Sequence, residues 1–295
     1  MSEKKHIIVT GAGGQLASEI QFLSGKQTNL RFTFLPFEQL DITNDAHLEE
    51  LFQNAKDWDV IINTAAYTAV DKAEEETEKA SMVNAQAMEK IGRLCHLNKK
   101  YIIHISTDFV FDGRLSRPYV ESDEANPINV YGKTKRTGEI NLLASNENSL
   151  IFRTSWLYST YGKNFFKTMR FLGESKSELK VVSDQVGTPT YALDLADFIL
   201  HVLQNELYLT NKGIFHFSNE GVASWYDFAW QIMKMSGLNC KVLPINSIEY
   251  PTPAARPNYS VLDKSNLKKK FNYLIPHWQE SLLECIKKSG NDIAK

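Results

Sequence analysis

The chain has 295 residues but few cysteines and no close pair of them. Cys95, Cys240 and Cys285 are odd in number and widely separated, so the sequence predicts neither a disulfide framework nor a thiolate zinc site. The 7 histidines form no HxxxH or HxH pattern. His104 lies inside an apolar run, where a core histidine with satisfied hydrogen bonds is the expected role. We therefore predict no metal at a catalytic site.

Long hydrophobic runs and an excess of one charge are also missing. No apolar segment approaches the roughly 20 residues that a membrane-spanning helix needs, and no long apolar signal core follows the first residues. The formal net charge is −2, with 23% charged and 43% hydrophobic residues, which is typical of a globular protein without a broad polyanion-binding surface. We expect a cytoplasmic protein with neither membrane nor nucleic acid as a partner.

The first half of the chain alternates short β-branched runs with helical stretches. Strands are expected at residues 7–9, 60–62 and 101–105, and helices at 15–23, 77–97 and 131–143. Later strands are expected at 150–153 and 179–182, and later helices at 193–203 and 225–236. The alternation predicts an α/β fold with a Rossmann-type, doubly wound parallel sheet and a smaller C-terminal α/β domain.

The sequence suggests two domains. We place a dinucleotide-binding domain at residues 1–150, and we expect segments within about 180–220 to be able to return to it. Residues 151–295 are expected to form mainly a substrate domain.

A glycine-rich turn follows the first expected strand. Gly11, Gly14 and Ala17 form a GxxGxxA pattern, which departs from GxGxxG but stands at the strand-to-helix junction where a dinucleotide pyrophosphate binds. The next strand, at 31–35, ends in neither an acid nor a base, so the choice between NADH and NADPH stays open. Asp41 and Ile42 could bind the adenine, although Asp41 could instead open a turn or cap a helix.

Hydroxyl and phenol side chains suggest a reaction centre. Thr107 follows the strand at 101–105, where it could donate to a carbonyl oxygen, although hydroxyl residues there also form turns. Tyr131 and Lys135 are four residues apart and share one face of the expected helix. A nearby ammonium would stabilise the phenolate. Alone, the pair also fits two solvated helix residues.

Seven segments, in order along the chain, resemble the dTDP-4-dehydrorhamnose reductases of the extended short-chain dehydrogenase/reductase family. They are residues 14–16, 63–73, 106–111, 129–135, 152–158, 184–190 and 250–257. The resemblance implies that NADPH or NADH reduces the C4 ketone of dTDP-4-dehydro-β-L-rhamnose to give dTDP-β-L-rhamnose. Tyr131 would give the proton, Thr107 would hold the oxygen, and Lys135 would lower the pKa of the tyrosine and bind the nicotinamide ribose.

The resemblance also implies the remaining site residues. The cofactor would be held by Tyr131 and Lys135 together with Gly11, Gly14, Gln15, Leu16, Asp41, Ile42, Ala65, Ala66, Tyr67 and Thr68. The dTDP-sugar would be held by Thr107, Asp108, Trp156 and Arg256, and residues 151–295 would form mainly the nucleotide-sugar substrate domain. Arginine suits a diphosphate because its guanidinium matches phosphate oxygens, although Arg256 could instead form a surface salt bridge.

Alternatives remain open from the sequence. The chain could be another nucleotide-sugar reductase or epimerase, or a non-catalytic NADP-binding regulatory subunit similar to that of methionine adenosyltransferase. The presence of Tyr131, Lys135 and Thr107 argues against the regulatory role. The resemblance also allows a homodimer. Some relatives share magnesium between glutamates at a dimer interface, but this chain has Glu19 with Leu193 where a second glutamate would stand, so we do not expect a metal-bridged dimer.

Overall fold

A six-stranded parallel sheet forms the centre of the computed structural model, which describes residues 4–292. The strand order is β10-β5-β4-β3-β1-β2. The strands are β1 (Lys5–Thr10), β2 (Leu30–Leu35), β3 (Val60–Asn63), β4 (Tyr101–Thr107), β5 (Ser149–Thr154) and β10 (Gly213–His216). β3 and β5 are buried at every residue, as expected for apolar strands covered on both faces. The predicted Rossmann-type fold is confirmed.

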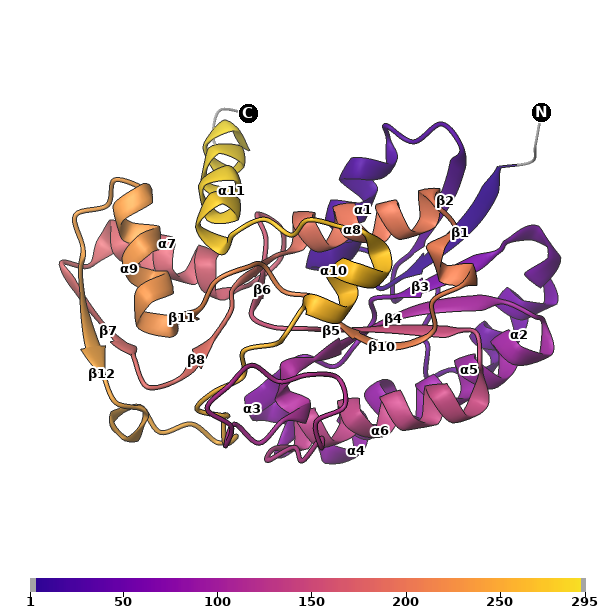
Figure 1. The fold of residues 1–295 in the computed structure, drawn as a ribbon, viewed down its shortest axis with the longest axis horizontal. Helices are drawn as coiled ribbons and strands as arrows, with labels where there is room; N and C mark the ends of the chain where they lie inside the picture. Colours follow the sequence, from indigo (N-terminus) through magenta and orange to yellow (C-terminus); the bar gives the residue numbers. More distant parts are fainter. Residues whose placement is uncertain (1–3, 293–295) are drawn as a thin grey trace.

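Helices cover both faces of this sheet (Figure 1). α1 (Gln15–Ser24) and α8 (Ala192–Gln204) pack together on one face, and α5 (Ala87–Leu97) and α6 (Val130–Ser145) pack together on the other. Adjacent side chains of β5 point to opposite faces, so Phe152 joins the core beneath α8 and Ile151 joins the core beneath α5 and α6.

Shorter helices and turns connect these elements. They are α2 (Asp45–Gln53), α3 (Val70–Ala73), α4 (Thr77–Ser81), a π-helical turn (Met82–Gln86), and 3-10 turns at Ala55–Asp57, Asp108–Val110, Leu207–Leu209 and Ser247–Glu249. The single helix expected at residues 77–97 is therefore α4, the π-helical turn and α5 in succession.

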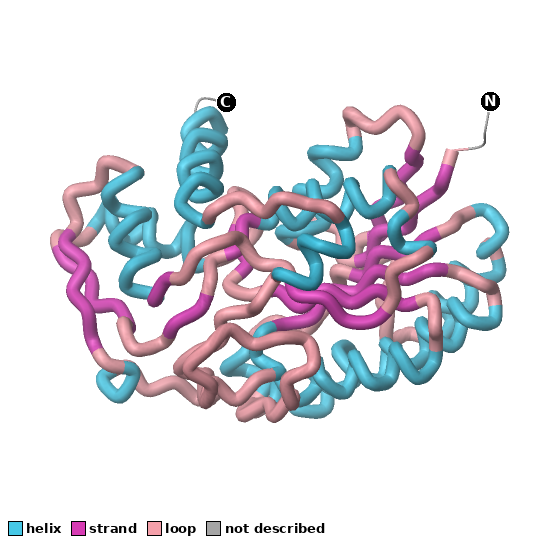
Figure 2. The backbone as a smooth tube through the Cα atoms, in the orientation of Figure 1, coloured by secondary structure: helices cyan, strands magenta, loops and turns pink. Residues whose placement is uncertain are grey.

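The chain beyond β5 builds a second, smaller α/β body beside the sheet (Figure 2). Its elements are β6 (Leu157–Tyr158), α7 (Phe165–Ser175), β7 (Glu178–Val182), β8 (Val186–Gly187), β9 (Thr190–Tyr191), β11 (Ala223–Ser224), α9 (Trp225–Met235), β12 (Lys241–Ile245) and α11 (Trp278–Asp292). β7 pairs with β12 and β6 with β9 in parallel, while β8 pairs with β11 antiparallel. A separate core, which includes Phe166, Phe228 and Trp278, holds these elements together.

Three later elements pack with the large sheet. α8 lies against α1, β10 pairs with β5, and Leu267 and Phe271 of α10 (Ser265–Phe271) enter the core beneath α8. The domain boundary near residue 150 stays a prediction, and this packing supports one in which segments near 180–220 return to the first domain. Within residues 4–292, no helix is long and apolar enough to cross a membrane.

The strand order fixes the position of the site. β2 and β3 lie on opposite sides of β1, so the chain leaves neighbouring strands toward opposite halves of the sheet. A parallel sheet opens a crevice at such a point, outside the carboxyl ends of its strands. The segments that follow β1, β3, β4 and β5 therefore meet at one edge.

Candidate functional site

A cavity of about 820 Å³ opens at this edge of the sheet. Every site residue predicted from the sequence lines it: Gly11, Gly14, Gln15, Leu16, Asp41, Ile42, Ala65, Ala66, Tyr67, Thr68, Thr107, Asp108, Tyr131, Lys135, Trp156 and Arg256. The structure therefore brings together residues that are up to 245 positions apart in sequence, since the set runs from Gly11 to Arg256. Their individual roles stay predictions.

The glycine-rich turn is shaped for close approach of a phosphate. Gly11 has a φ of +70°, and a Cβ atom there would lie 2.8 Å from the backbone nitrogen of Ala65. Only glycine fits this conformation without strain. α1 begins at Gln15 with no side-chain cap and no acidic residue in its first turn, so its N-terminal N–H groups are available to an anion. The turn fits a dinucleotide pyrophosphate.

A loop at residues 159–164 lies over this turn and was not predicted as part of the site. Asn164 Nδ2 donates to Gln15 Oε1 at 2.8 Å, and Ser159 Oγ donates to Glu19 Oε1 at 2.6 Å. These contacts bring Gly162, Lys163 and Asn164 to the cavity wall. Their partners are about 140 positions away in sequence, so no local pattern could have indicated them.

Asp41, which also lines the cavity, forms a turn. Its Oδ1 accepts hydrogen bonds from the backbone nitrogen and the hydroxyl of Thr43, at 2.9 and 2.7 Å. This is the turn-forming role that the sequence left open, and the residue still lines the cavity beside Ile42. Phe37, which was not predicted, also lines the cavity and is 67% exposed, so its ring is available to a planar ligand such as adenine.

Tyr131 stands in the first turn of α6, and that turn is held tightly against the end of β4. Asn129 caps the helix by accepting from the backbone nitrogen of Gly132 at 2.7 Å. A Cβ atom on Gly132 would lie only 2.1 Å from the backbone oxygen of Phe109. The glycine therefore allows the close packing that places Tyr131 beside Thr107.

Burial is the largest influence on the pKa values of Tyr131 and Lys135. Burial raises the pKa of Tyr131 to about 12, although the Thr107 hydroxyl lowers it, and nearby Asp108 raises it further. Burial lowers the pKa of Lys135 to about 8, although Glu139 raises it. In the protein without ligand, burial thus outweighs any lowering of the tyrosine pKa by Lys135. The phenol is protonated at neutral pH, which is the form a proton donor requires.

A buried ion pair between α6 and β5 stabilises the position of the helix that carries Tyr131 and Lys135. Glu139 on α6 is 0% exposed and Arg153 on β5 is 1% exposed. Arg153 donates to both carboxylate oxygens, at 2.8 and 2.7 Å, and Ser106 on β4 donates to the same carboxylate at 2.6 Å. Burial raises the pKa of Glu139, but Arg153, Ser106 and Arg136 together lower it by more, so the carboxylate stays charged. This contact fixes α6 against β4 and β5.

Asp108 carries a buried oxygen without a partner. The residue is 2% exposed, its Oδ1 accepts from Thr107 Oγ1 at 3.1 Å, and its Oδ2 has no hydrogen-bond partner among the described residues. Burial raises its pKa to about 7 in spite of the hydrogen bonds it accepts. The nearby Ser260 hydroxyl also lowers the pKa of this carboxyl. An unsatisfied buried acceptor is costly, so Oδ2 needs a donor, either from Ser260 or from a ligand in the cavity.

Two tryptophans form an aromatic wall of the cavity. Trp156 has a φ of +47°, and its ring stacks on Trp225 with centroids 3.6 Å apart and planes 7° apart. A Cβ atom on Gly187 would lie 2.7 Å from the Trp156 ring, so the ring also packs closely against the backbone of Gly187. A left-handed tryptophan persists only where its surroundings impose it. Trp225 was missed because only the fold brings it to Trp156.

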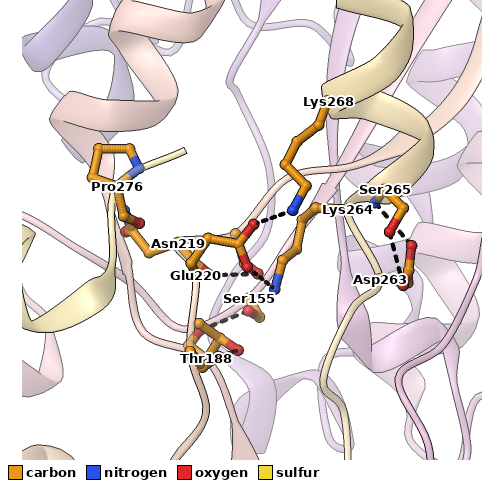
Figure 3. A network of polar contacts seen from close by, with 11 residues as sticks. Ser155, Thr188, Asn219, Glu220, Asp263, Lys264, Ser265, Lys268 and Pro276 are labelled. Atoms are coloured by element: carbon orange, nitrogen blue, oxygen red, sulfur yellow. Dashed lines mark hydrogen bonds and ion pairs between the residues drawn. The ribbon is translucent and has the colours of Figure 1, made fainter. Parts of the chain in front are cut away.

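Polar contacts fix the segments around this wall (Figure 3). Ser155 donates to the backbone oxygen of Thr188 at 2.7 Å, which holds the backbone directly before Trp156. Glu220 accepts from Lys268 at 2.6 Å and lies 3.6 Å from Lys264, both on or beside α10. The loop between β10 and β11 is thereby tied to α10.

Arg256 lines the cavity but is also engaged by the protein. It donates to both carboxylate oxygens of Asp71, at 3.0 and 2.7 Å, and to the backbone oxygen of Ala254 at 2.9 Å. The salt bridge that the sequence left as an alternative is therefore present. Binding of a diphosphate by Arg256 stays a prediction.

Within residues 4–292, no group of three or more His, Cys, Asp or Glu side chains is arranged to hold a metal ion. Glu19, which we noted in the sequence, is 0% exposed and accepts hydrogen bonds from Ser159 and from Lys288, each at 2.6 Å. Leu193 packs at the edge of the smaller core. Both oxygens of the Glu19 carboxylate are thus satisfied within the chain.

Comparison with known proteins agrees with this geometry. Residues 5–291 match the family described as the RmlD substrate binding domain. A spore coat polysaccharide biosynthesis protein of Bacillus subtilis is 38% identical over 97% of this chain and 98% of its own. A dTDP-4-dehydrorhamnose reductase structure from Clostridium acetobutylicum has 43% identity and a TM-score of 0.91, over 96% of this chain and 99% of its own. Another from Bacillus anthracis, in complex with NADP, has 36% identity and a TM-score of 0.89, over 97% and 99%. The chain belongs to the RmlD substrate-binding-domain family.

Proposed function

We propose that this protein catalyses the reaction of dTDP-4-dehydrorhamnose reductases, in which NADPH or NADH reduces the C4 ketone of dTDP-4-dehydro-β-L-rhamnose to dTDP-β-L-rhamnose. The observation that carries the proposal is the convergence of Tyr131, Thr107 and Lys135 with the glycine-rich turn in one cavity. The relatives that carry this enzyme name, and the NADP in one of them, support the substrate and the cofactor.

The residues of the site suit the charge that develops during reduction. A bound NADPH or NADH would supply the hydride that C4 accepts, while the former carbonyl oxygen takes up the bonding electrons. Thr107 donates a hydrogen bond to that oxygen, and Tyr131 transfers its phenolic proton to it, so the product is a neutral hydroxyl. Lys135 lies one helical turn from Tyr131, where its ammonium stabilises the phenolate left behind and donates to the cofactor ribose.

Different parts of the cavity wall contact the cofactor and the substrate. Gly11, Gly14 and the free N-terminus of α1 suit the pyrophosphate of the cofactor. The unpartnered oxygen of Asp108 accepts from a sugar hydroxyl, and the Trp156 ring packs against the sugar. Arg256 binds the dTDP diphosphate, which requires it to share its donors with Asp71. A cytoplasmic location and a homodimer stay predictions.

The test is the loss of NADPH absorbance when enzymatically generated dTDP-4-dehydro-β-L-rhamnose is added to the protein. We expect substrate-dependent oxidation of NADPH, or of NADH, and dTDP-β-L-rhamnose as the product. Cofactor binding without turnover would favour the regulatory alternative. Interconversion of sugar epimers without net cofactor oxidation would favour an epimerase.

A further inference from the structure

Lys135 depends on acceptors that β4 provides. The side chain is 1% exposed, and a buried ammonium is stable only when its hydrogens find partners. The backbone oxygen of Ile105 lies 2.6 Å from Nζ, and Nε2 of His104 lies 3.3 Å from it. An ammonium has three hydrogens, so these two contacts leave one for the cavity that Lys135 lines.

His104 is the residue expected from the sequence to be a satisfied core histidine. It is 1% exposed, and burial together with the charge of Lys135 lowers its pKa well below the ordinary value. The ring is therefore neutral at physiological pH, with a lone pair on one nitrogen. Among the described residues, its side-chain contacts to polar groups are Lys135 at Nε2 and the Asn63 amide at Nδ1, 3.0 Å away. One of the two groups that satisfy it is thus the predicted catalytic lysine.

We propose that His104 is a positioning residue for the reduction: its Nε2 accepts from Lys135 and, with Ile105, orients the third ammonium hydrogen toward the cofactor ribose. This inference rests on the proposed function and deepens it. His104 acts through Lys135 and does not touch the reacting atoms.

The proposal fixes the position of the imidazole proton. If Nε2 accepts from the ammonium, the proton is on Nδ1 and needs an acceptor. In the structure, Asn63 Nδ2 lies 3.0 Å from Nδ1 and donates to the backbone oxygen of Ala65 at 3.3 Å, and Asn63 Oδ1 accepts from the Thr10 hydroxyl at 2.6 Å. A half-turn of the Asn63 amide presents its oxygen to Nδ1 and its NH2 group to Thr10 Oγ1, at the cost of the hydrogen bond to Ala65. Thr10 is the last residue of β1, directly before the glycine-rich turn. A line of buried hydrogen bonds then joins the phosphate-binding end of β1 to Lys135.

The charged groups around Lys135 and His104 determine the direction in which kcat depends on pH. Burial lowers the pKa of Lys135 and Glu139 on the same helix raises it, while Asp108 acts on Tyr131. Removal of the acceptor at Nε2 destabilises the ammonium and lowers the pKa of Lys135 further. Because the reduction uses the charged lysine, the alkaline limb of the kcat profile should move to lower pH.

Three substitutions separate this role from a purely structural one. His104→Leu removes both ring nitrogens, His104→Asn reaches only the Asn63 side, and His104→Gln places an amide oxygen near the position of Nε2. We expect kcat to fall about tenfold in the Leu and Asn variants, with the alkaline limb shifted to lower pH and the KM for the sugar within about twofold. The Gln variant should keep most of the turnover and the original limb. Equal losses in all three variants, or a fixed alkaline limb, would overturn the proposal.

A second measurement does not need turnover. In protein labelled with nitrogen-15 at histidine, we expect NMR to show His104 as a neutral ring with the proton on Nδ1 and an unprotonated Nε2. A proton on Nε2 would overturn the inference even in an active enzyme. The expected tautomer in a protein that does not reduce the sugar would instead reject the proposed function and leave the contact with Lys135 intact.

Discussion

Among single residues, Tyr131 shows how strongly the cavity walls control acid–base chemistry. Its pKa is raised to about 12 by burial although the Thr107 hydroxyl acts in the opposite direction. A reductase needs the protonated phenol at the start of each turnover, so this direction suits the reaction. In the proposed reaction, the lysine four residues later would act less to ionise the tyrosine in advance than to stabilise the phenolate once the proton has moved.

Replacement of the phenol tests this role. Tyr131→Phe removes the proton donor and keeps the ring, so we expect kcat to fall by about a hundredfold or more, while NADPH affinity changes little. Steady-state assays and a fluorescence titration with NADPH measure the two quantities. Tyr250→Phe makes the same chemical change on a 62% exposed side chain and serves as the control. Undiminished turnover of Tyr131→Phe would remove Tyr131 from the mechanism.

Asp108 should make stability depend on pH in a direction unusual for a carboxylate. Its pKa is raised by burial from 3.8 to about 7, so between these values the folded protein binds the proton more tightly than the unfolded chain does. Stability is therefore lost as the pH rises through this window. One pKa unit corresponds to about 1.4 kcal/mol, so ionisation of Asp108 costs at most about 4 kcal/mol.

The variant Asp108→Asn has no carboxyl to ionise, so its stability does not fall as the pH rises through this window. We expect its free energy of unfolding, relative to the parent protein, to increase between about pH 4 and 7 and to level off above pH 7. Urea unfolding at a series of pH values measures the difference. A difference that stays constant with pH would mean that Asp108 does not titrate in this range.

At the scale of elements, the position of α6 depends on a charge pair buried beneath it. Arg153→Met removes the guanidinium and leaves Glu139, which is 0% exposed, with Arg136 as its remaining ion-pair partner among the described residues. We expect the free energy of unfolding to fall by about 3 kcal/mol, because an uncompensated carboxylate is left in the interior. Burial would then raise the pKa of Glu139, so the loss should be smaller at acidic pH, where the carboxylate is protonated.

Arg136→Met provides the matched control. Arg136 binds the same carboxylate at 2.9 Å, but its side chain is 31% exposed, so its removal should cost only about 1 kcal/mol or less. Denaturant unfolding of both variants measures the two losses. Equal losses would show that the position of α6 does not depend on the buried partner in particular.

The helices, strands and loops differ in how far they could be predicted from the sequence. The strands around the site were predictable because apolar β-branched runs mark them. Gly11 directly follows β1, Thr107 is the last residue of β4, and Tyr131 and Lys135 share the first turns of α6. β10 has only four residues, and its place beside β5 depends on a long-range pairing that no local pattern contains. The loop at residues 159–164 and Trp225 were missed for the same reason, because their partners are distant in sequence.

For the whole molecule, one carboxylate connects the C-terminal helix α11 to α1, the helix that follows the glycine-rich turn. Glu19 on α1 accepts from Ser159, in the loop over the glycine-rich turn, and from Lys288 on α11. The Lys288 side chain is 19% exposed, and its ammonium lies 3.9 Å from the centre of the Phe22 ring. An ammonium of this chain thus neutralises the glutamate that could otherwise face a metal ion.

This arrangement predicts that a homodimer, if one forms, does not depend on divalent metal. We expect dialysis against EDTA to leave the mass measured by light scattering and the unfolding temperature unchanged. Lys288→Met should lower the free energy of unfolding by about 1–3 kcal/mol, because it leaves the buried carboxylate of Glu19 with one donor. Lys287→Met, at an exposed neighbour on α11, should have little effect. Dissociation by EDTA that magnesium reverses would show that Glu19 exchanges Lys288 for a metal ion in the assembled protein.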